Sequence, residues 1–299
     1  MVGKLFTLLA LTISVGSVIT SSIPTGAAVV STAPVLSPTP SSSVAQAPKA
    51  LSAKSTSTGN GKVGLAWANG PASYLQFYIT SSVNWIYTWS PDTPDPDNQY
   101  GLEFMPMLWG TDQIDEFESV VTAGYAKYIL GFDEPNESDQ SNLDPYTAAS
   151  LWQQHIEPKR ALGYQTCSPA TSSNPNGFTW MQNFFDACNG GCTVDFICVH
   201  WYDLQASDFQ EYVERWYNTY NKDIFITEFA PQNLNGGAQP NTTDLWTFYQ
   251  TVMPWIQQTS YIKGAFPFGF IMSDGSASAL MTASGQPTDL GYYIINGNY

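Results

Sequence analysis

Eight short apolar runs alternate with segments of helical character, and this alternation constrains the fold more than any other feature of the sequence. The runs are rich in β-branched and aromatic residues, and they predict strands at 63–67, 83–89, 104–109, 128–134, 165–169, 195–202, 224–229 and 264–268. Such alternation predicts an α/β fold with a parallel sheet, and eight units match a (β/α)8 barrel, or TIM barrel. An open doubly wound sheet is the alternative, but no glycine-rich phosphate-binding turn follows the first run.

The segments between the runs carry helix start and stop signals. Helices are predicted at 112–124, 145–163, 177–189, 207–221 and 243–259, several of which open on acidic or capping residues and close at glycine or asparagine. The crossover at 90–103 is rich in Pro and Asp and predicts an irregular loop.

The first 61 residues differ in composition from the rest of the chain. Residues 1–26 place Lys4 before a short apolar run and predict a signal peptide, since the run is too short to span a bilayer. Residues 27–61 are rich in Ser, Thr, Pro and Ala, and we expect them to be disordered. We therefore expect a single folded catalytic domain at 62–299, secreted to the extracellular space or cell wall.

The charge of the chain limits its partners. The formal net charge is −15, and three of the ten basic residues lie in the first 61 residues. Nucleic acid, anionic membranes and acidic polysaccharides are poor partners for such a surface. Ten Trp and seventeen Tyr suit a neutral polysaccharide, whose sugar rings stack on aromatic faces, although core packing explains most of these rings. We expect a monomer.

Two glutamates stand at the carboxyl ends of apolar runs. Glu134 ends the fourth run and Glu228 lies near the end of the seventh. Barrel active sites lie at this end of the strands. Two carboxyl groups about 5–5.5 Å apart are what retaining glycoside hydrolysis requires. A solvated rim residue or an ion-pair partner is the alternative for either glutamate alone.

Five segments in order resemble glycoside hydrolase family 128, whose fungal members include cell-wall proteins of the alkali-sensitive-linkage type. They are Met105-Pro106-Met107-Leu108-Trp109-Gly110, Gly131-Phe132-Asp133-Glu134-Pro135-Asn136, Ser168-Pro169-Ala170, Asp195-Phe196-Ile197-Cys198-Val199-His200-Trp201-Tyr202 and Thr227-Glu228-Phe229-Ala230. The resemblance implies a clan A (β/α)8 barrel that cleaves β-1,3-glucan with retention of configuration. It also implies that Glu134 is the general acid/base and Glu228 the nucleophile.

The sequence departs from the family pattern at two places. The family has Asn immediately before the acid/base and Asp after the proline, whereas this chain has Asp133 and Asn136. An ionised aspartate only accepts hydrogen bonds, and its charge should raise the pKa of Glu134. We expect activity to survive and Asp133→Asn not to lower it. At the eighth run Phe268 stands where the family places Trp or Tyr, so a donor is lost.

Asp133, Asn136 and Phe268 are candidate substrate-binding residues, and so are other residues at the same strand ends. We expect His200 to bond the catalytic groups or a sugar hydroxyl, and Tyr202 follows it on the same run. Trp89 and Trp109 end the second and third runs and are candidate platforms for glucosyl rings. Core packing is the alternative for each.

The cysteines and sequons carry further expectations. Cys188 and Cys192 flank a short flexible turn and are expected to pair, whereas Cys167 and Cys198 could pair or remain buried thiols. The two histidines have no metal-ligand spacing, and the expected chemistry needs no metal or other cofactor. Asn241 is a candidate glycosylation site; the sequon at Asn136 should be unoccupied because it lies at the catalytic mouth.

Two other functions remain open. A non-catalytic or weakly active β-glucan-binding protein on the same barrel is favoured by Asp133 and Phe268 but opposed by the two glutamates. A related enzyme acting on β-1,4-glucan or mannan is the other.

Overall fold

The computed structural model describes residues 61–272 and 278–299. The expected signal peptide and all but the last residue of the Ser/Thr/Pro-rich segment lie outside the described residues. Each of the eight predicted runs holds a strand, namely β1 Val63–Ala66, β2 Val83–Tyr87, β3 Glu103–Phe104, β4 Tyr128–Leu130, β5 Gln165–Cys167, β6 Ile197–Asp203, β7 Ile224–Pro231 and β8 Ile262–Pro267.

The strands pair in parallel, which confirms the predicted α/β class with a parallel sheet. Six of them form one sheet in the order β3-β2-β1-β8-β7-β6, and β4 and β5 form a second. Single bridges join the two sheets, one between Met107 and Leu130 and one between Cys167 and Phe196. The regular ladder is therefore not continuous around all eight strands. Pro106 stands at the first of these two seams and lacks the backbone N–H that a longer ladder to β4 needs.

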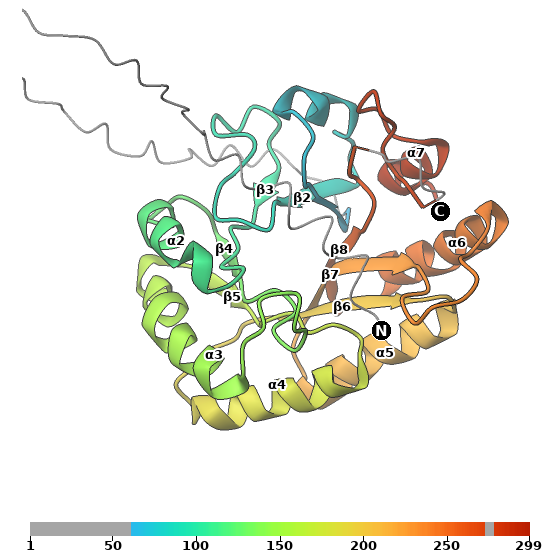
Figure 1. Ribbon diagram of the computed structural model, residues 1–299. Coiled ribbons are helices and arrows are strands. Elements are labelled where there is room, and N and C mark those ends of the chain that lie inside the picture. The colour runs from blue at the N-terminus through green and yellow to red at the C-terminus, as the bar shows by residue number, and fades with distance from the viewer. Residues whose placement is uncertain (1–60, 273–277) are drawn as a thin grey trace, which may run out of the picture. The chain divides into compact units, whose positions relative to one another are not determined.

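The helices lie outside the strands (Figure 1). The predicted helices correspond to α2 Ile114–Val120, α3 Pro145–Leu151, α4 Pro175–Cys188, α5 Ala206–Tyr220 and α6 Thr242–Gln258. The 3-10 turn η2 Thr111–Gln113 precedes α2, and the expected loop at 90–103 contains no helix. Two elements were not predicted, the 3-10 helix η1 Ala72–Phe77 and the C-terminal α7 Asp289–Asn296. Among the described residues no helix is both long and apolar enough to cross a membrane.

The predicted helix 145–163 is not uniform. It continues from α3 as the π-helical η3 Trp152–Ile156 and the 3-10 helix η4 Glu157–Leu162. Pro158 lies at the start of η4, and its missing N–H and bulky ring prevent a regular α-helix through this point. The segment still ends at Gly163, which adopts a left-handed conformation with φ 96°.

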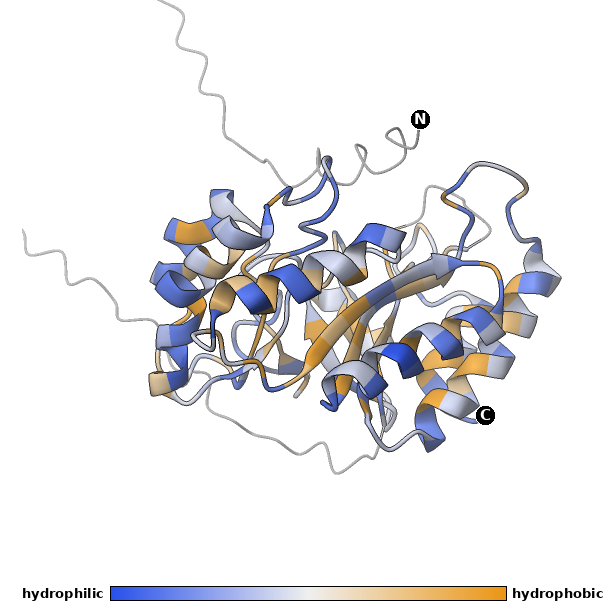
Figure 2. Cartoon of the chain, turned by 90° about the horizontal axis from the view of Figure 1, so that it is seen from below, coloured by the Kyte–Doolittle hydropathy of each residue, from blue (hydrophilic) through white to orange (hydrophobic). Residues whose placement is uncertain are grey.

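The core has two layers because strand side chains alternate between opposite faces. In β7, Phe225 belongs to an inner cluster, whereas Ile224 and Ile226 belong to the cluster between strands and helices. The same alternation separates Cys198 from Val199 in β6. Figure 2 shows the apolar strands running between helices whose outward surfaces are largely hydrophilic.

Two disulfides tie the described part of the chain. The expected Cys188–Cys192 bridge is present at the end of α4. Cys167 and Cys198 also pair, with their Cα atoms 5.6 Å apart. This second bridge joins β5 to β6 at the seam where the ladder is reduced to a single bridge.

Candidate active site

Glu134 and Glu228 are both buried at the carboxyl ends of their strands. Glu228 lies within β7, opposite His200 of β6, and Glu134 lies four residues beyond the last residue of β4. Each glutamate is about 4% exposed. The strand that carries Glu134 approaches its neighbour closely, since a Cβ on Gly131 would lie 2.7 Å from the Pro169 nitrogen.

Three neutral donors surround the Glu228 carboxylate. The Trp89 indole N–H donates to Oε1 at 2.7 Å. The single Tyr87 hydroxyl proton is shared between the Thr227 carbonyl at 3.0 Å and the same Glu228 oxygen at 3.3 Å. The Tyr202 hydroxyl donates to Oε2 at 2.5 Å. Donors at both oxygens hold the Glu228 carboxyl group in one orientation, which is what a nucleophile needs.

His200 links the two glutamates. Its Nδ1 lies 2.9 Å from Oε1 of Glu134 and 3.8 Å from Oε2 of Glu228. The two carboxylate oxygens are therefore no farther apart than the sum of these distances, which is compatible with the separation of about 5–5.5 Å in a retaining pair. The imidazole is completely buried, so it acts as a fixed group between the two carboxyls.

The surroundings of Glu134 and His200 shift the pKa values of both side chains. Burial raises the pKa of Glu134, and the nearby charge of Glu228 adds to this, although His200 acts in the opposite direction. Burial by itself lowers the pKa of His200, but the charges of Glu228, Glu134 and Asp133 and the bond to Glu134 raise that pKa to about 9. Glu134 is thus favoured as the proton-carrying carboxyl, and the charge of Glu228, the largest of the effects that raise the pKa of His200, favours the imidazolium form of His200.

The backbone is strained at two of these residues. Glu134 has φ 37° and Trp89 has φ 54°, both in the left-handed region that bulky side chains rarely adopt. The Glu134 N–H donates to the Ala170 carbonyl at 2.8 Å, which ties the strained turn to the end of the fifth run. Such strain persists only where the surroundings impose it, and it clusters at functional sites.

Asp133 is a third buried carboxyl group in the same cluster. It is 3% exposed, and its Oδ1 has no hydrogen-bond partner. One oxygen of Asp133, one of Glu228 and one nitrogen of His200 lie within 4.8 Å of one another. These three could approach a metal ion, but Glu228 and the Nδ1 of His200 are already engaged by protein hydrogen bonds, and only the Nε2 of His200 has no partner. The donor set therefore fits a hydrogen-bonded acid pair better than a metal centre.

The other residues predicted from the sequence take different positions. Phe268 packs edge-on against Trp89 and Tyr202, with ring centroids 6.1 and 5.7 Å away. The Trp109 side chain opposes the rise in the pKa of Asp133. Asn136 instead joins a polar network in which its amide donates to Glu137, Ser172 and Asn176.

Tyr87 is a member of the site that sequence reasoning missed. It lies two residues before Trp89, and its ring contacts that of Trp89 at 4.8 Å. The period of two along β2 places both residues on the inner face. That period was the available signal, but it does not reveal that the hydroxyl reaches Glu228.

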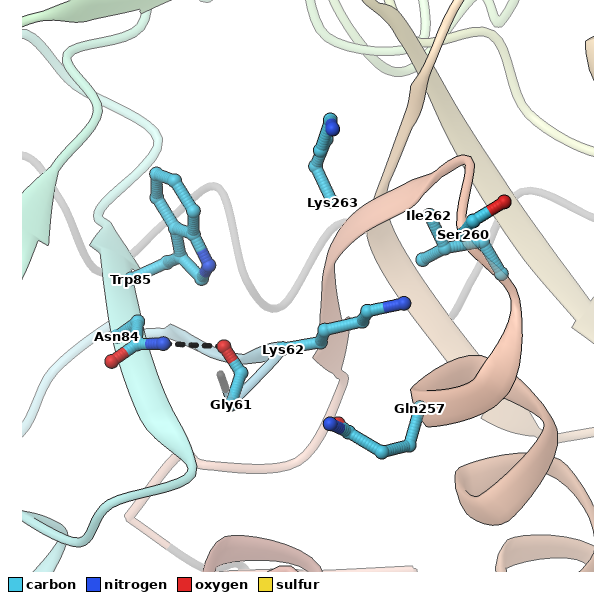
Figure 3. Close-up of a pocket in the computed structure, with 8 residues that line it drawn as sticks. All are labelled: Gly61, Lys62, Asn84, Trp85, Gln257, Ser260, Ile262 and Lys263. Atoms are coloured by element: carbon cyan, nitrogen blue, oxygen red, sulfur yellow. Dashed lines mark hydrogen bonds between the residues drawn. The ribbon is translucent and has the colours of Figure 1, made fainter. Parts of the chain in front are cut away.

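A pocket lies at the amino-terminal ends of the strands, and the contacts of its two lysines explain why they are there (Figure 3). It is lined by Gly61, Lys62, Asn84, Trp85, Gln257, Ser260, Ile262 and Lys263. Lys62 donates to the carbonyls of Ile256 and Thr259 at the end of α6, and Lys263 pairs with Asp223. Both cations therefore stabilise the fold at the amino-terminal ends of β1 and β8, away from the two glutamates.

Comparison with known proteins identifies this arrangement. Residues 64–293 match the family described as glycosyl hydrolase catalytic core. Alkali-sensitive linkage protein 1 of Schizosaccharomyces pombe is 29% identical over 248 residues, which are 79% of this chain and 45% of that protein. The chain thus matches less than half the length of that relative.

Solved structures give the same result. A curdlan-specific exo-β-1,3-glucanase of glycoside hydrolase family 128 from Blastomyces gilchristii is 29% identical, with a TM-score of 0.65 over 79% of this chain and 98% of that one. An endo-β-1,3-glucanase of the family from Sorangium cellulosum is 25% identical, with a TM-score of 0.68 over 79% of this chain and 98% of that one. The chain therefore belongs to the glycosyl hydrolase catalytic core family, and it is similar to solved members of glycoside hydrolase family 128.

Proposed function

We propose that this protein is a retaining glycoside hydrolase that cleaves β-1,3-glucosidic bonds in cell-wall glucan, with Glu228 as nucleophile and Glu134 as general acid/base. The observation that carries the proposal is the buried pair itself. Three neutral donors hold one carboxylate, and the other carboxyl, whose pKa is raised, lies against His200. The two glutamates thus differ in the way that a nucleophile and an acid must differ.

The first chemical step uses both groups together. An oxygen of Glu228 attacks the anomeric carbon, the bond to the leaving oxygen breaks, and Glu134 gives its proton to that oxygen. Tyr87, Trp89 and Tyr202 keep Glu228 aligned for attack. The product is a glucosyl ester on Glu228 and a glucan chain with a new free hydroxyl.

The second step reverses the roles. Glu134, now a carboxylate, takes a proton from water, and the water oxygen attacks the anomeric carbon and displaces Glu228. The Glu134 carboxylate formed in the first step lies beside the His200 imidazolium, which stabilises its charge. Two displacements at one carbon give retention of configuration.

The site is best understood within a (β/α)8 barrel. The bridges at Met107–Leu130 and Cys167–Phe196 fill the two gaps between the sheets, so the pairing order follows all eight strands in sequence and returns to β1. A barrel of this kind gathers the carboxyl ends of β4 and β7 at one mouth.

The substrate proposal rests on charge and on relatives. A chain with net charge −15 favours a neutral polymer. The fungal and bacterial enzymes above are described as β-1,3-glucanases, and another bacterial member was solved with laminaritriose. The fungal relative and this substrate class favour an extracellular or cell-wall location.

The decisive experiment measures sugar release and stereochemistry. We expect the protein to release reducing sugar from linear β-1,3-glucan, and Glu134→Gln and Glu228→Gln to abolish release. The matched control is Glu211→Gln on the exposed side of α5, which should retain full activity. Nuclear magnetic resonance during early hydrolysis should show the β-anomer first.

Rescue of inactive variants by azide distinguishes the nucleophile from the general acid/base. With an aryl β-glucoside whose leaving group needs no proton, Glu134→Ala plus azide should form a β-glucosyl azide, and Glu228→Ala plus azide an α-glucosyl azide. Binding of laminarin without any release by the parent protein would instead favour the glucan-binding alternative. First formation of the α-anomer would rule out the retaining mechanism.

A further inference from the structure

We propose that Asp133 retains its proton in the working enzyme and serves as a neutral positioning residue, so that the buried cluster holds a single carboxylate, Glu228. This inference rests on the proposed function for its catalytic consequence, but the protonation state itself can be tested without activity. It also differs from the simplest interpretation of the sequence, in which Asp133 is a second ionised group beside Glu134.

The partners of the three carboxyl groups support this assignment. Glu228 accepts three hydrogen bonds, and Glu134 lies against the imidazole of His200. Asp133 Oδ1 is shielded from water and has no hydrogen-bond partner, and the nearby Nε2 of His200 has none either. A buried carboxylate with so little compensation is costly, and taking up a proton is the usual way to avoid the cost.

The surrounding charges favour the same state. Asp133 faces the Glu228 carboxylate of β7, its neighbour Glu134 and the Tyr87 hydroxyl of β2, and one cation, His200 of β6. One imidazolium balances one carboxylate, so two further negative charges would be left without a counter-ion. Burial and the charge of Glu228 accordingly raise the pKa of Asp133 well above its ordinary value, against the opposing effect of His200.

The retained proton has a consequence for catalysis. Ionisation of Asp133 would place a second negative charge beside Glu228 and Glu134, and Glu134 would then release its proton to the leaving oxygen less readily. The active form therefore needs two protons, one on Glu134 and one on Asp133. An asparagine at this position is also neutral and has nearly the same shape, so it should replace the protonated acid but not the ionised one.

The direct test is difference infrared spectroscopy of the resting enzyme. At about pH 6 an ordinary aspartate is ionised. We expect the protonated-carboxyl carbonyl band of the parent to lose the Asp133 contribution in Asp133→Asn, which keeps the contribution of Glu134. The exposed control Asp115→Asn should retain the full band. If the parent and Asp133→Asn show the same band intensity at this pH, Asp133 is ionised and the proposal is wrong.

The kinetic test uses the alkaline side of the pH profile. We expect kcat/KM of the parent to fall towards about a hundredfold per pH unit, because two groups must stay protonated, and that of Asp133→Asn about tenfold per unit. The comparison uses the slope of each protein's own profile, so a difference in absolute activity between the two proteins does not enter it. Equal alkaline slopes would overturn the proposal. A parent inactive on every glucan would refute the proposed function alone, and the infrared band would still decide the state of Asp133.

Discussion

The strained residues of this site show why single side chains matter here. Trp89 adopts φ 54°, and the only described polar contact of its side chain is the 2.7 Å hydrogen bond to Glu228. Its ring is 7% exposed, so in the free protein it is mostly covered rather than open as a platform. The strain is therefore best explained by the need to aim the indole N–H at the nucleophile.

Replacement of this indole tests that explanation. Trp89→Phe should lower kcat by roughly tenfold to a hundredfold, since a hydrogen bond to a charged group contributes about 1.5–3 kcal/mol. The substrate KM should change less, because the lost donor orients Glu228. Trp246→Phe in α6 is the matched control, and steady-state kinetics on laminarin make the comparison. A variant with unchanged kcat and raised KM would instead indicate a sugar-binding platform.

His200 should control where activity declines with rising pH. It lowers the pKa of Glu134 and of Asp133 through its positive charge. Removing the cation in His200→Asn should raise both pKa values, so the alkaline decline in kcat/KM should move to higher pH while kcat falls. The pH profile measures both effects. A shift to lower pH would contradict the assignment of His200 as an imidazolium at neutral pH.

The two sequons differ in the availability of their amide nitrogens. The Nδ2 of Asn136 donates to three side chains at 2.8–3.1 Å. Asn241 caps α6 through Oδ1, which accepts from Thr243 and Asp244, so this contact does not involve Nδ2. In a eukaryotic secretory host we expect glycan at Asn241 and none at Asn136. Glycopeptide mapping with Ser138→Ala and Thr243→Ala as sequon controls checks this, and an occupied Asn136 in active protein would contradict it.

At the scale of elements, the seam between β5 and β6 depends on a covalent bond. Only one bridge residue pair joins these strands, and the Cys167–Cys198 disulfide lies at that point, two residues before His200. The disulfide thus holds β6, and with it the histidine of the site, beside β5 where a ladder would otherwise do so.

Removal of either disulfide should lower the free energy of unfolding, but by different amounts. Chain entropy predicts a loss of about 4 kcal/mol for the bridge with sequence separation 31 and about 2 kcal/mol for the matched Cys188–Cys192 bridge with separation 4. Urea unfolding of Cys167→Ala/Cys198→Ala and Cys188→Ala/Cys192→Ala gives the comparison. If the second variant loses more stability than the first, the seam does not depend on its disulfide.

Strands and helices could be predicted from the sequence where the hydrophobic periodicity and the residues typical of element ends indicated the same boundaries. All eight runs contain strands, and α5 and α6 lie within one or two residues of their predicted ends. The third run, predicted at 104–109, holds the two-residue strand Glu103–Phe104, since Pro106 cannot continue a ladder. The short η1 and α7 were missed because neither belongs to the strand–helix repeat on which the prediction was based.

The sequence predicted which residues gather at the site, but it did not predict which of their side chains contact one another. Strand ends placed Trp89, Asp133, Glu134, His200, Tyr202 and Glu228 together, because parallel strands share one carboxyl edge. The sequence could not show that Trp89 and Tyr202 both point at Glu228, nor that Tyr87 joins them. Those contacts depend on positive φ values and side-chain directions that no local pattern specifies.

At the scale of the whole molecule, charge and buried acids predict greatest stability in mildly acidic solution. His200 has a pKa of about 9 in the folded protein against an ordinary 6.5, so its contribution is fully present below pH 6.5 and is lost as pH rises through 9. The raised pKa values of Asp133 and Glu134 act in the same direction. Lowered pKa values of Glu118 and Asp195, which pair with basic groups, make stability fall again in strong acid.

Thermal unfolding at several pH values and salt concentrations tests this prediction. We expect the highest Tm near about pH 5–6 and a steady decline towards pH 9. Because the net charge of −15 is self-repulsive, raising salt to about 0.5 M should increase Tm more at pH 8 than at pH 5, where fewer carboxylates are charged. The His200→Asn variant should show a flatter decline between pH 6.5 and 9, since it lacks the group that titrates there. An equally steep decline in the variant would mean that surface charge, and not the buried cluster, sets the pH dependence of stability.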